Sequence, residues 1–140
     1  MSFKISIPLA GLAASAVLVG AALAAPSAAT LTIRHQTKGC HTWAFAGGAW
    51  KASQHVTLAK GAKLTIVDND IMPHTLVQQS GPQAKLSTPA MRHMGARATA
   101  VFAKAGTYVF KTRAGEDYPS MSHIKTIGED NVLRLVVTVR

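Results

Sequence analysis

The sequence has a single cysteine, Cys40, among its 140 residues. One cysteine cannot form a disulfide within the chain, so the fold must rest on its hydrophobic core alone. In an exported protein, an isolated thiol is prone to oxidation unless it is buried, paired with another chain or bound to a metal. Cys40 is therefore the first residue that points to a particular chemistry.

Acidic residues are also scarce, because 6 Asp and Glu stand against 15 Lys and Arg. All of these acids fall in turn-like segments, which leaves few groups for acid–base catalysis. The chain also lacks a Gly-x-Ser-x-Gly elbow, a His-Glu-x-x-His pattern and a phosphate-binding loop, so we do not expect an enzyme. The basic residues are dispersed, without the clusters typical of RNA-binding proteins. The charge therefore favours an anionic surface or an acidic partner protein, and not nucleic acid.

The long apolar run of the sequence lies at its N-terminus, where residues 5–25 follow Lys4. This arrangement predicts a signal peptide over residues 1–24, because Ala22-Leu23-Ala24 has the small residues that signal peptidases recognise. Cleavage after Ala29 is an alternative. An uncleaved membrane anchor is another, since the run approaches the roughly 20 residues that span a bilayer. Both readings place the rest of the chain in the periplasm or outside the cell. Removing Lys4 from the net charge of +9 leaves +8 on the mature part.

Residues 31–140 are predicted to form one domain, preceded by a disordered leader over residues 25–30. Short segments with alternating apolar residues recur along this part, separated by glycine and asparagine or aspartate turns, and no long helical period is present. Seven such segments predict strands at 31–36, 55–59, 63–67, 75–78, 98–102, 107–111 and 132–139. A chain of short strands with glycine-rich turns indicates an all-β sandwich.

Metal-binding side chains are concentrated in four places between the predicted strands. These are Cys40-His41, Met72-Pro73-His74, the group Met91, His93 and Met94, and the pair Met121 and His123. Thiolate, thioether and imidazole are the donors that select copper, especially Cu(I), over calcium or magnesium. Cysteine with histidine also suits zinc, but zinc rarely binds methionine. The donor types therefore predict copper.

The order of these segments resembles the cupredoxins. The segment from Val56 to Val77 contains a strand, a Lys-Gly turn, a second strand and an Asp-Asn-Asp loop that leads to His74, which matches the first copper-binding histidine of that family. The later segment Phe102-Ala-Lys-Ala-Gly-Thr-Tyr-Val-Phe110 is similar to the hairpin that precedes the family's ligand loop. The resemblance covers the whole mature domain and implies a Greek-key β-sandwich with a copper site at one end.

The ligand loop of that family is not intact in this chain. Thr112 stands where a cysteine normally follows the last hairpin, Asp117 stands near the histidine's place, and Met121 alone keeps a ligand type. A rearranged site is predicted instead, in which the first loop supplies Cys40 and His41. Together with His74 and Met121 they form the proposed set, close to the two-His, one-Cys, weak-Met composition of electron-transfer copper sites. Both Cys40 and His41 can bind only if the backbone there is irregular.

Several alternatives remain open at this stage. His123 is an alternative fourth ligand. Met91, His93 and Met94 form either a second Cu(I) site or one apolar face of a helical turn. The predicted function is an exported copper protein that relays electrons or passes copper to other proteins, with an acidic redox partner or a copper donor or acceptor as its partner. The alternative is a metal-free binding or structural module, because a fold alone does not determine function.

Overall fold

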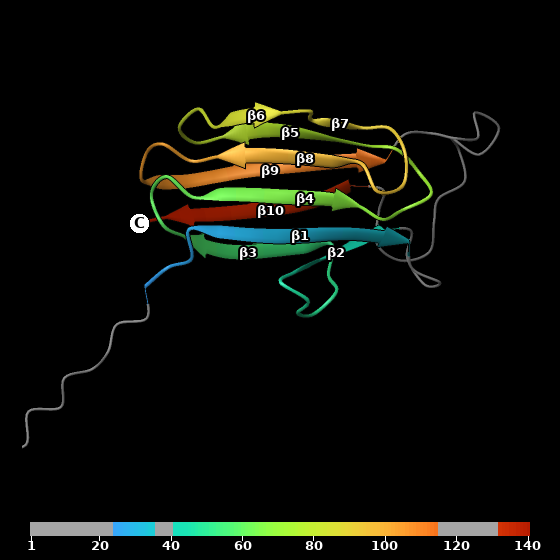
Figure 1. The fold of residues 1–140 in the computed structure, drawn as a ribbon, viewed down its shortest axis with the longest axis horizontal. Helices are drawn as coiled ribbons and strands as arrows, with labels where there is room; N and C mark the ends of the chain where they lie inside the picture. The colour runs from blue at the N-terminus through green and yellow to red at the C-terminus, as the bar shows by residue number, and fades with distance from the viewer. Residues whose placement is uncertain (1–23, 36–40, 115–131) are drawn as a thin grey trace, which may run out of the picture.

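The computed structural model describes residues 24–35, 41–114 and 132–140. Within these ranges the chain forms ten β-strands (Figure 1). They are β1 (Ala28–His35), β2 (His41–Phe45), β3 (Ser53–Leu58), β4 (Lys63–Asp68), β5 (His74–Ser80), β6 (Lys85–Ser87), β7 (Ala90–Met91), β8 (Arg97–Val101), β9 (Gly106–Ala114) and β10 (Val132–Val139).

The strands form two five-stranded sheets that pack face to face as a sandwich. The first, called sheet A here, has the order β2-β1-β4-β8-β6, and the second, sheet B, has the order β3-β10-β9-β5-β7. Each sheet is mixed: β1 runs parallel to β4, β10 runs parallel to β3, and the other neighbouring strands are antiparallel. The predicted all-β sandwich is therefore confirmed.

Alternation along each strand explains how the two sheets bury one face each. In β10, Leu133, Leu135, Val137 and Val139 are buried, while Arg134 between them is exposed. Successive side chains of a strand point to opposite faces, so this pattern directs the apolar set towards the other sheet. Three aromatic rings meet in the core. The ring of Phe102 lies edge-on to Tyr108 and Phe110, with centroid distances of 4.9 and 6.1 Å.

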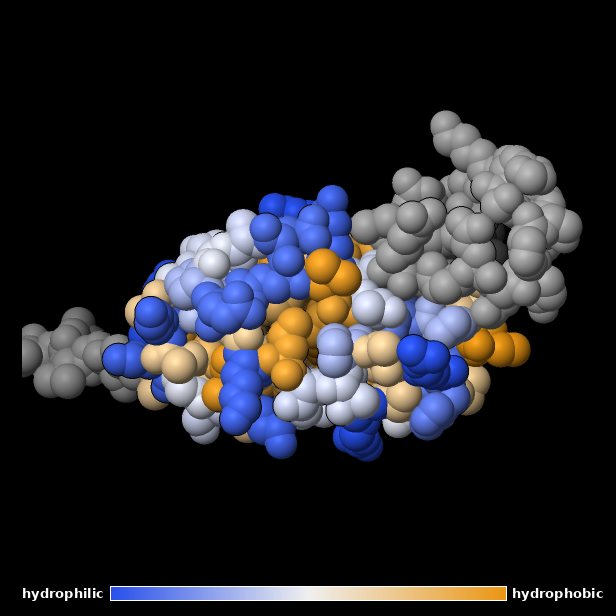
Figure 2. All heavy atoms as spheres, turned by 90° about the horizontal axis from the view of Figure 1, so that it is seen from above, coloured by the Kyte–Doolittle hydropathy of each residue, from blue (hydrophilic) through white to orange (hydrophobic). Residues whose placement is uncertain are grey.

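Strands β6 and β7 end the two sheets on the same side of the sandwich. They contain only three and two residues, and short edge strands limit pairing with other chains. Seen from this side, apolar residues are visible between hydrophilic borders (Figure 2). Leu86 of β6 is half-buried, and Val77 of β5, the strand beside β7, is 48% exposed.

Three details of the secondary structure differ from the sequence-based prediction. The prediction of about seven strands missed β2, β6 and β7, because each is short and is held by pairing with another strand. Strand β1 begins at Ala28, so residues 28–30 belong to the sheet and not to a disordered leader; their backbone pairs with β4 from Lys63 onwards. The helical turn suggested near Met91 is instead strand β7 followed by a turn.

The predicted signal peptide, residues 1–24, lies almost wholly outside the described residues. Among the described residues, no helix is long and apolar enough to cross a membrane.

Candidate metal centre

The strand ends that flank the predicted ligand loops lie together at one end of the sandwich. In sheet A, the end of β1 pairs with the start of β2 through His35 and His41, and Ile33 pairs with Asp68 at the end of β4. In sheet B, the first residue of β5, His74, pairs with Ala114, the last residue of β9. The register therefore brings the borders of all three segments to the same end, as the sequence led us to expect.

The loop from β4 to β5 is organised by two aspartate side chains. The Oδ1 atom of Asp68 accepts a hydrogen bond from the backbone N–H of Asp70 at 3.0 Å. The Oδ1 atom of Asp70 in turn accepts one from the N–H of Met72 at 3.2 Å. Aspartate commonly bonds to the backbone two residues ahead in this way, which shapes a turn. Two successive turns therefore deliver the chain to His74 in a defined position.

His74 is buried, with 1% of its surface exposed, and both of its ring nitrogens face protein groups. Its Nε2 lies 3.2 Å from Oδ2 of Asp70, which is also buried. Its Nδ1 lies 3.3 Å from Oγ1 of Thr112, a buried residue of β9. A carboxylate accepts a hydrogen bond, so Asp70 favours the tautomer with the proton on Nε2. In that tautomer Nδ1 is the nitrogen with a lone pair, and the Thr112 hydroxyl donates to it.

Asp68 is the second buried acid of this cluster. Among the described residues, its Oδ2 is a buried side-chain oxygen without a hydrogen-bond partner. Burial raises the pKa of Asp68 above its ordinary value of 3.8, because the charged form loses hydration. The backbone N–H groups of Asp70 and His74, together with the nearby His74 ring, act in the opposite direction on the pKa, and they are outweighed.

Of the four predicted ligands, His74 is the one whose side chain the structure describes. Cys40 and Met121 lie outside the described residues, as does the alternative ligand His123. His41 begins β2, but its side chain is not described. All four ligand assignments therefore stay predictions. Among the described residues, no group of three His, Cys, Asp or Glu side chains is arranged to hold a metal ion.

The methionine-rich segment after β6 is divided between the core and the surface. Met91 is fully buried and pairs with His74 across β5 and β7. His93 is exposed, with its Nδ1 3.0 Å from the carbonyl oxygen of Met94, and Met94 is 58% exposed. Met91 thus belongs to the core, whereas the other two side chains lie on the surface.

Sequence reasoning did not identify Asp70 and Thr112 as the partners of His74. The spacing of four residues between Asp70 and His74 was a local signal that pointed to the first. Thr112 was noted as standing where a cysteine is normal in the cupredoxin pattern, and the structure places it against Nδ1 of His74. Leu76 pairs with Thr112 in the sheet, which sets this contact between residues far apart in the sequence.

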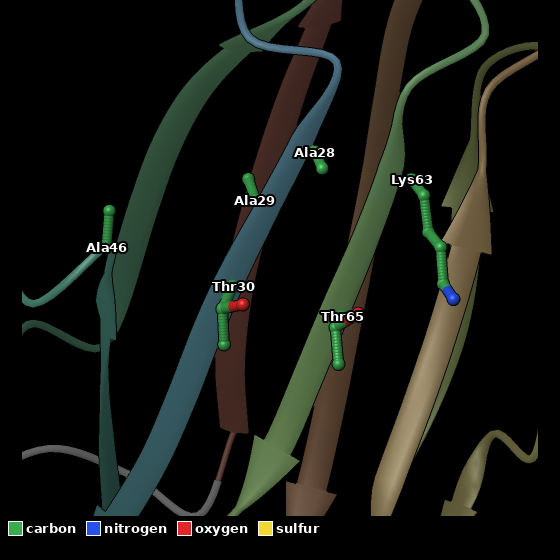
Figure 3. Close-up of a pocket in the computed structure, with 6 residues that line it drawn as sticks. All are labelled: Ala28, Ala29, Thr30, Ala46, Lys63 and Thr65. Carbon is green, nitrogen blue, oxygen red and sulfur yellow. The ribbon is translucent and has the colours of Figure 1, made fainter.

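A shallow pocket of about 550 Å³ lies away from these residues, on the outer face of sheet A (Figure 3). It is lined by Ala28, Ala29, Thr30, Ala46, Lys63 and Thr65. Ala28 and Lys63 begin β1 and β4, whereas Asp68 ends β4, so the pocket is at the opposite end of the strands. It holds one titratable side chain, and we place the candidate site at His74 because the interacting polar groups are there.

No protein-family model matches the sequence, and no curated protein is similar to it in sequence. Similar solved structures include amicyanin from Paracoccus versutus, at 18% identity over 81% of each chain with a TM-score of 0.44. A purple cupredoxin from Nitrosopumilus maritimus is 19% identical over 80% of this chain and 99% of its own, with a TM-score of 0.42. An inclusion body protein (PixA) from Burkholderia cenocepacia is 10% identical over 84% of this chain and 98% of its own, with a TM-score of 0.50.

At these identities the similarity concerns the fold alone. The two mixed sheets form an all-β sandwich, as the sequence predicts.

Proposed function

We propose that this chain is an exported copper-binding protein in which His74 binds the metal through Nδ1. The observation that carries the proposal is the hydrogen bond between Nε2 of His74 and the buried carboxylate of Asp70. Histidines that bind metals usually donate their other ring N–H to a carboxylate or carbonyl, which holds the ring and its tautomer. Asp70 would play this part for His74.

The remaining donors of the proposed site are Cys40, His41 and Met121, whose segments are bordered by strand ends at the same end of the sandwich. Their thiolate, imidazole and thioether groups suit copper, whereas the hydroxyl of Thr112 and the carboxylate of Asp68 are harder donors that suit it less. His74 fits the metal, because its imidazole is an intermediate donor that copper accepts. A bound copper ion would supply single-electron chemistry by changing between Cu(I) and Cu(II).

Electron transfer is the role that His74 supports best, with copper delivery as the second. A ring held at Nε2 by Asp70 and buried at 1% exposure cannot reorient easily. Copper at Nδ1 would take the place of the hydrogen bond from Thr112. Electron transfer benefits from such a rigid ligand, because the site keeps one geometry in both oxidation states, whereas copper delivery needs an exposed, exchangeable ligand. We propose no enzymatic activity, a periplasmic or extracellular location, and an acidic redox protein or a copper donor or acceptor as partner.

A metal-free binding or structural module is the alternative, and one observation favours it. Thr112 already provides a hydrogen bond to Nδ1 of His74, at the position where the cupredoxin pattern has a cysteine. A buried polar network whose members are hydrogen-bonded can serve folding specificity alone.

Copper titration of the purified protein, followed by visible absorption, tests the proposal. We expect stoichiometric binding that His74→Ala abolishes, and an intense absorption band that also requires Cys40. Asp70→Ala should weaken copper binding by roughly 10- to 100-fold, the usual effect of removing a group that orients a ligand. Asp70→Asn keeps a carbonyl oxygen near Nε2 and should recover part of the affinity.

Tight but colourless Cu(I) binding would replace electron transfer by copper delivery as the function. Absence of stoichiometric binding to the folded protein would overturn the copper proposal and leave the metal-free module. Affinity that is unchanged in folded His74→Ala would also contradict the assigned ligand.

A further inference from the structure

The described surface of the molecule carries charges of one sign. Every lysine and arginine whose side chain is described is exposed. The two acids among the described residues, Asp68 and Asp70, are both buried. The charged side chains exposed on the described part of the protein are therefore all positive. No Asp or Glu side chain of that part is exposed beside them.

Two of these cations are directly opposite each other on the outer face of sheet B. Lys111 of β9 pairs in register with Arg134 of β10, and both side chains are exposed. On either side of them in the same row are Val77 of β5 and Ser53 of β3. We call these four residues the cationic row. Within the described part of the chain, neither Lys111 nor Arg134 forms an ion pair.

The cationic row also has apolar neighbours. Val77 is 48% exposed, and Val109 and Val136, which pair with each other in the next row, are half-buried. Their outward side chains lie on the same face as Lys111 and Arg134, since residues two apart in a strand share a face. The face thus combines exposed apolar atoms with two adjacent cations.

Like charges at directly opposed positions of a sheet repel each other, because the side chains start only about 5 Å apart. A carboxylate group placed between Lys111 and Arg134 would remove this repulsion and bind both cations. Positive residues that meet carboxylates of a partner raise the association rate, and they select against proteins that are positively charged themselves. An acidic ligand is therefore complementary to the cationic row.

We propose that the outer face of sheet B is the docking surface for an acidic protein, whose carboxylates bind between Lys111 and Arg134 while its apolar atoms cover Val77 and Val109. A protein fits this face better than an anionic bilayer. Side chains that insert into bilayers are typically Trp, Phe and Leu, and the apolar residues of this face are valines.

The docking surface is the reverse side of the sheet that holds His74. Lys111 directly precedes Thr112, whose side chain points into the sandwich and contacts His74. A partner bound to the cationic row is thus separated from His74 by a single sheet. The binding itself involves no copper ligand, so it does not depend on the proposed metal function.

The test uses the metal-free protein with poly-L-glutamate as the acidic probe, measured by titration calorimetry at low and at physiological ionic strength. We compare the double variant Lys111→Glu/Arg134→Glu with the matched control Lys63→Glu/Lys85→Glu. The control changes the charge equally but on the outer face of sheet A, where both lysines flank Val101. We expect Lys111→Glu/Arg134→Glu to weaken the binding of poly-L-glutamate by about tenfold or more, and the control variant to weaken it by about threefold or less.

Equal losses in the two double variants would overturn the proposal, because only the total charge would then matter. Binding to phosphatidylserine vesicles without binding to poly-L-glutamate would also overturn it and point to a membrane. If neither probe binds at low ionic strength, the proposal is also overturned. If the charge-reversal variant fails to fold, Lys111→Gln/Arg134→Gln takes its place. Because copper is absent, failure of the copper titration and failure of this test are separate results.

Discussion

Replacing Asp68 by asparagine should stabilise the metal-free protein near neutral pH. Oδ1 of Asp68 accepts a hydrogen bond from Asp70, and asparagine can keep this bond through its carbonyl oxygen. Oδ2 is buried and has no hydrogen-bond partner among the described residues. Leaving a buried polar group unsatisfied costs about 1–3 kcal/mol, and more when it is charged. Since the amide is uncharged, we expect a gain of about 1–3 kcal/mol in the free energy of unfolding at pH 7.

The effect should depend on pH in a defined direction. The pKa of Asp68 in the folded state is raised by burial above its ordinary value of 3.8. The stability that the protonated acid provides is therefore complete below pH 3.8 and is lost as the pH rises through the folded-state pKa. The benefit of Asp68→Asn should accordingly be absent in acid and should appear above that window.

Urea unfolding of both proteins at several pH values measures this difference, and thermal unfolding provides a check. Asp70→Asn is the matched control, because both oxygens of Asp70 have partners in Met72 and His74. We expect the control to lower stability by about 1–2 kcal/mol at pH 7. A loss of stability in Asp68→Asn at neutral pH would refute the reasoning, since it would mean that the charged Oδ2 has a favourable partner.

Two further predictions concern the fold. Gly81 has a φ of +98°, and a Cβ there would collide with the carbonyl oxygen of Thr107 and lie 2.8 Å from Cα of Tyr108. Gly81→Ala should therefore lower the free energy of unfolding by about 3 kcal/mol, measured by thermal unfolding. Gly61→Ala is the control and should cost about 1 kcal/mol, because φ there is +81° but no atom lies near the added Cβ. Equal losses in the two variants would contradict the collision. Tyr108→Phe removes the 2.6 Å hydrogen bond from the buried phenol to the carbonyl oxygen of Lys104. It should lower the free energy of unfolding in urea by about 1 kcal/mol, and an unchanged stability would argue against that bond.

Residues of the core were predictable wherever the pattern was local. The alternation in 132–139 predicted one apolar face, and Leu133, Leu135 and Val137 are fully buried. The turn at Lys60-Gly61 and the end of the strand at Asp68 were also predictable, because glycine and aspartate favour turns through their own backbone preferences and hydrogen bonds.

Short strands were missed because their own residues do not specify them. Strand β2 follows a glycine-containing segment, and it is held by its register with β1, from His35 and His41 to Leu31 and Phe45. The first residues of β1 are small and weakly patterned, and they become a strand because Ala28 pairs with Lys63. Pairing with another segment decides such elements, since strand preference depends strongly on context.

The features of the candidate site also divide into those that the sequence predicted and those that only the tertiary structure decided. The sequence by itself determined the class of fold and marked His74 as a candidate ligand, because composition, alternation and the Asp-Asn-Asp loop are local properties. Tertiary structure alone decided the contact of His74 with Thr112. Thr112 is 38 residues away, and the register of β5 with β9 brings its hydroxyl to Nδ1. The burial of Asp68 and Asp70 was likewise decided by the packing of two sheets, which leaves the described surface positively charged.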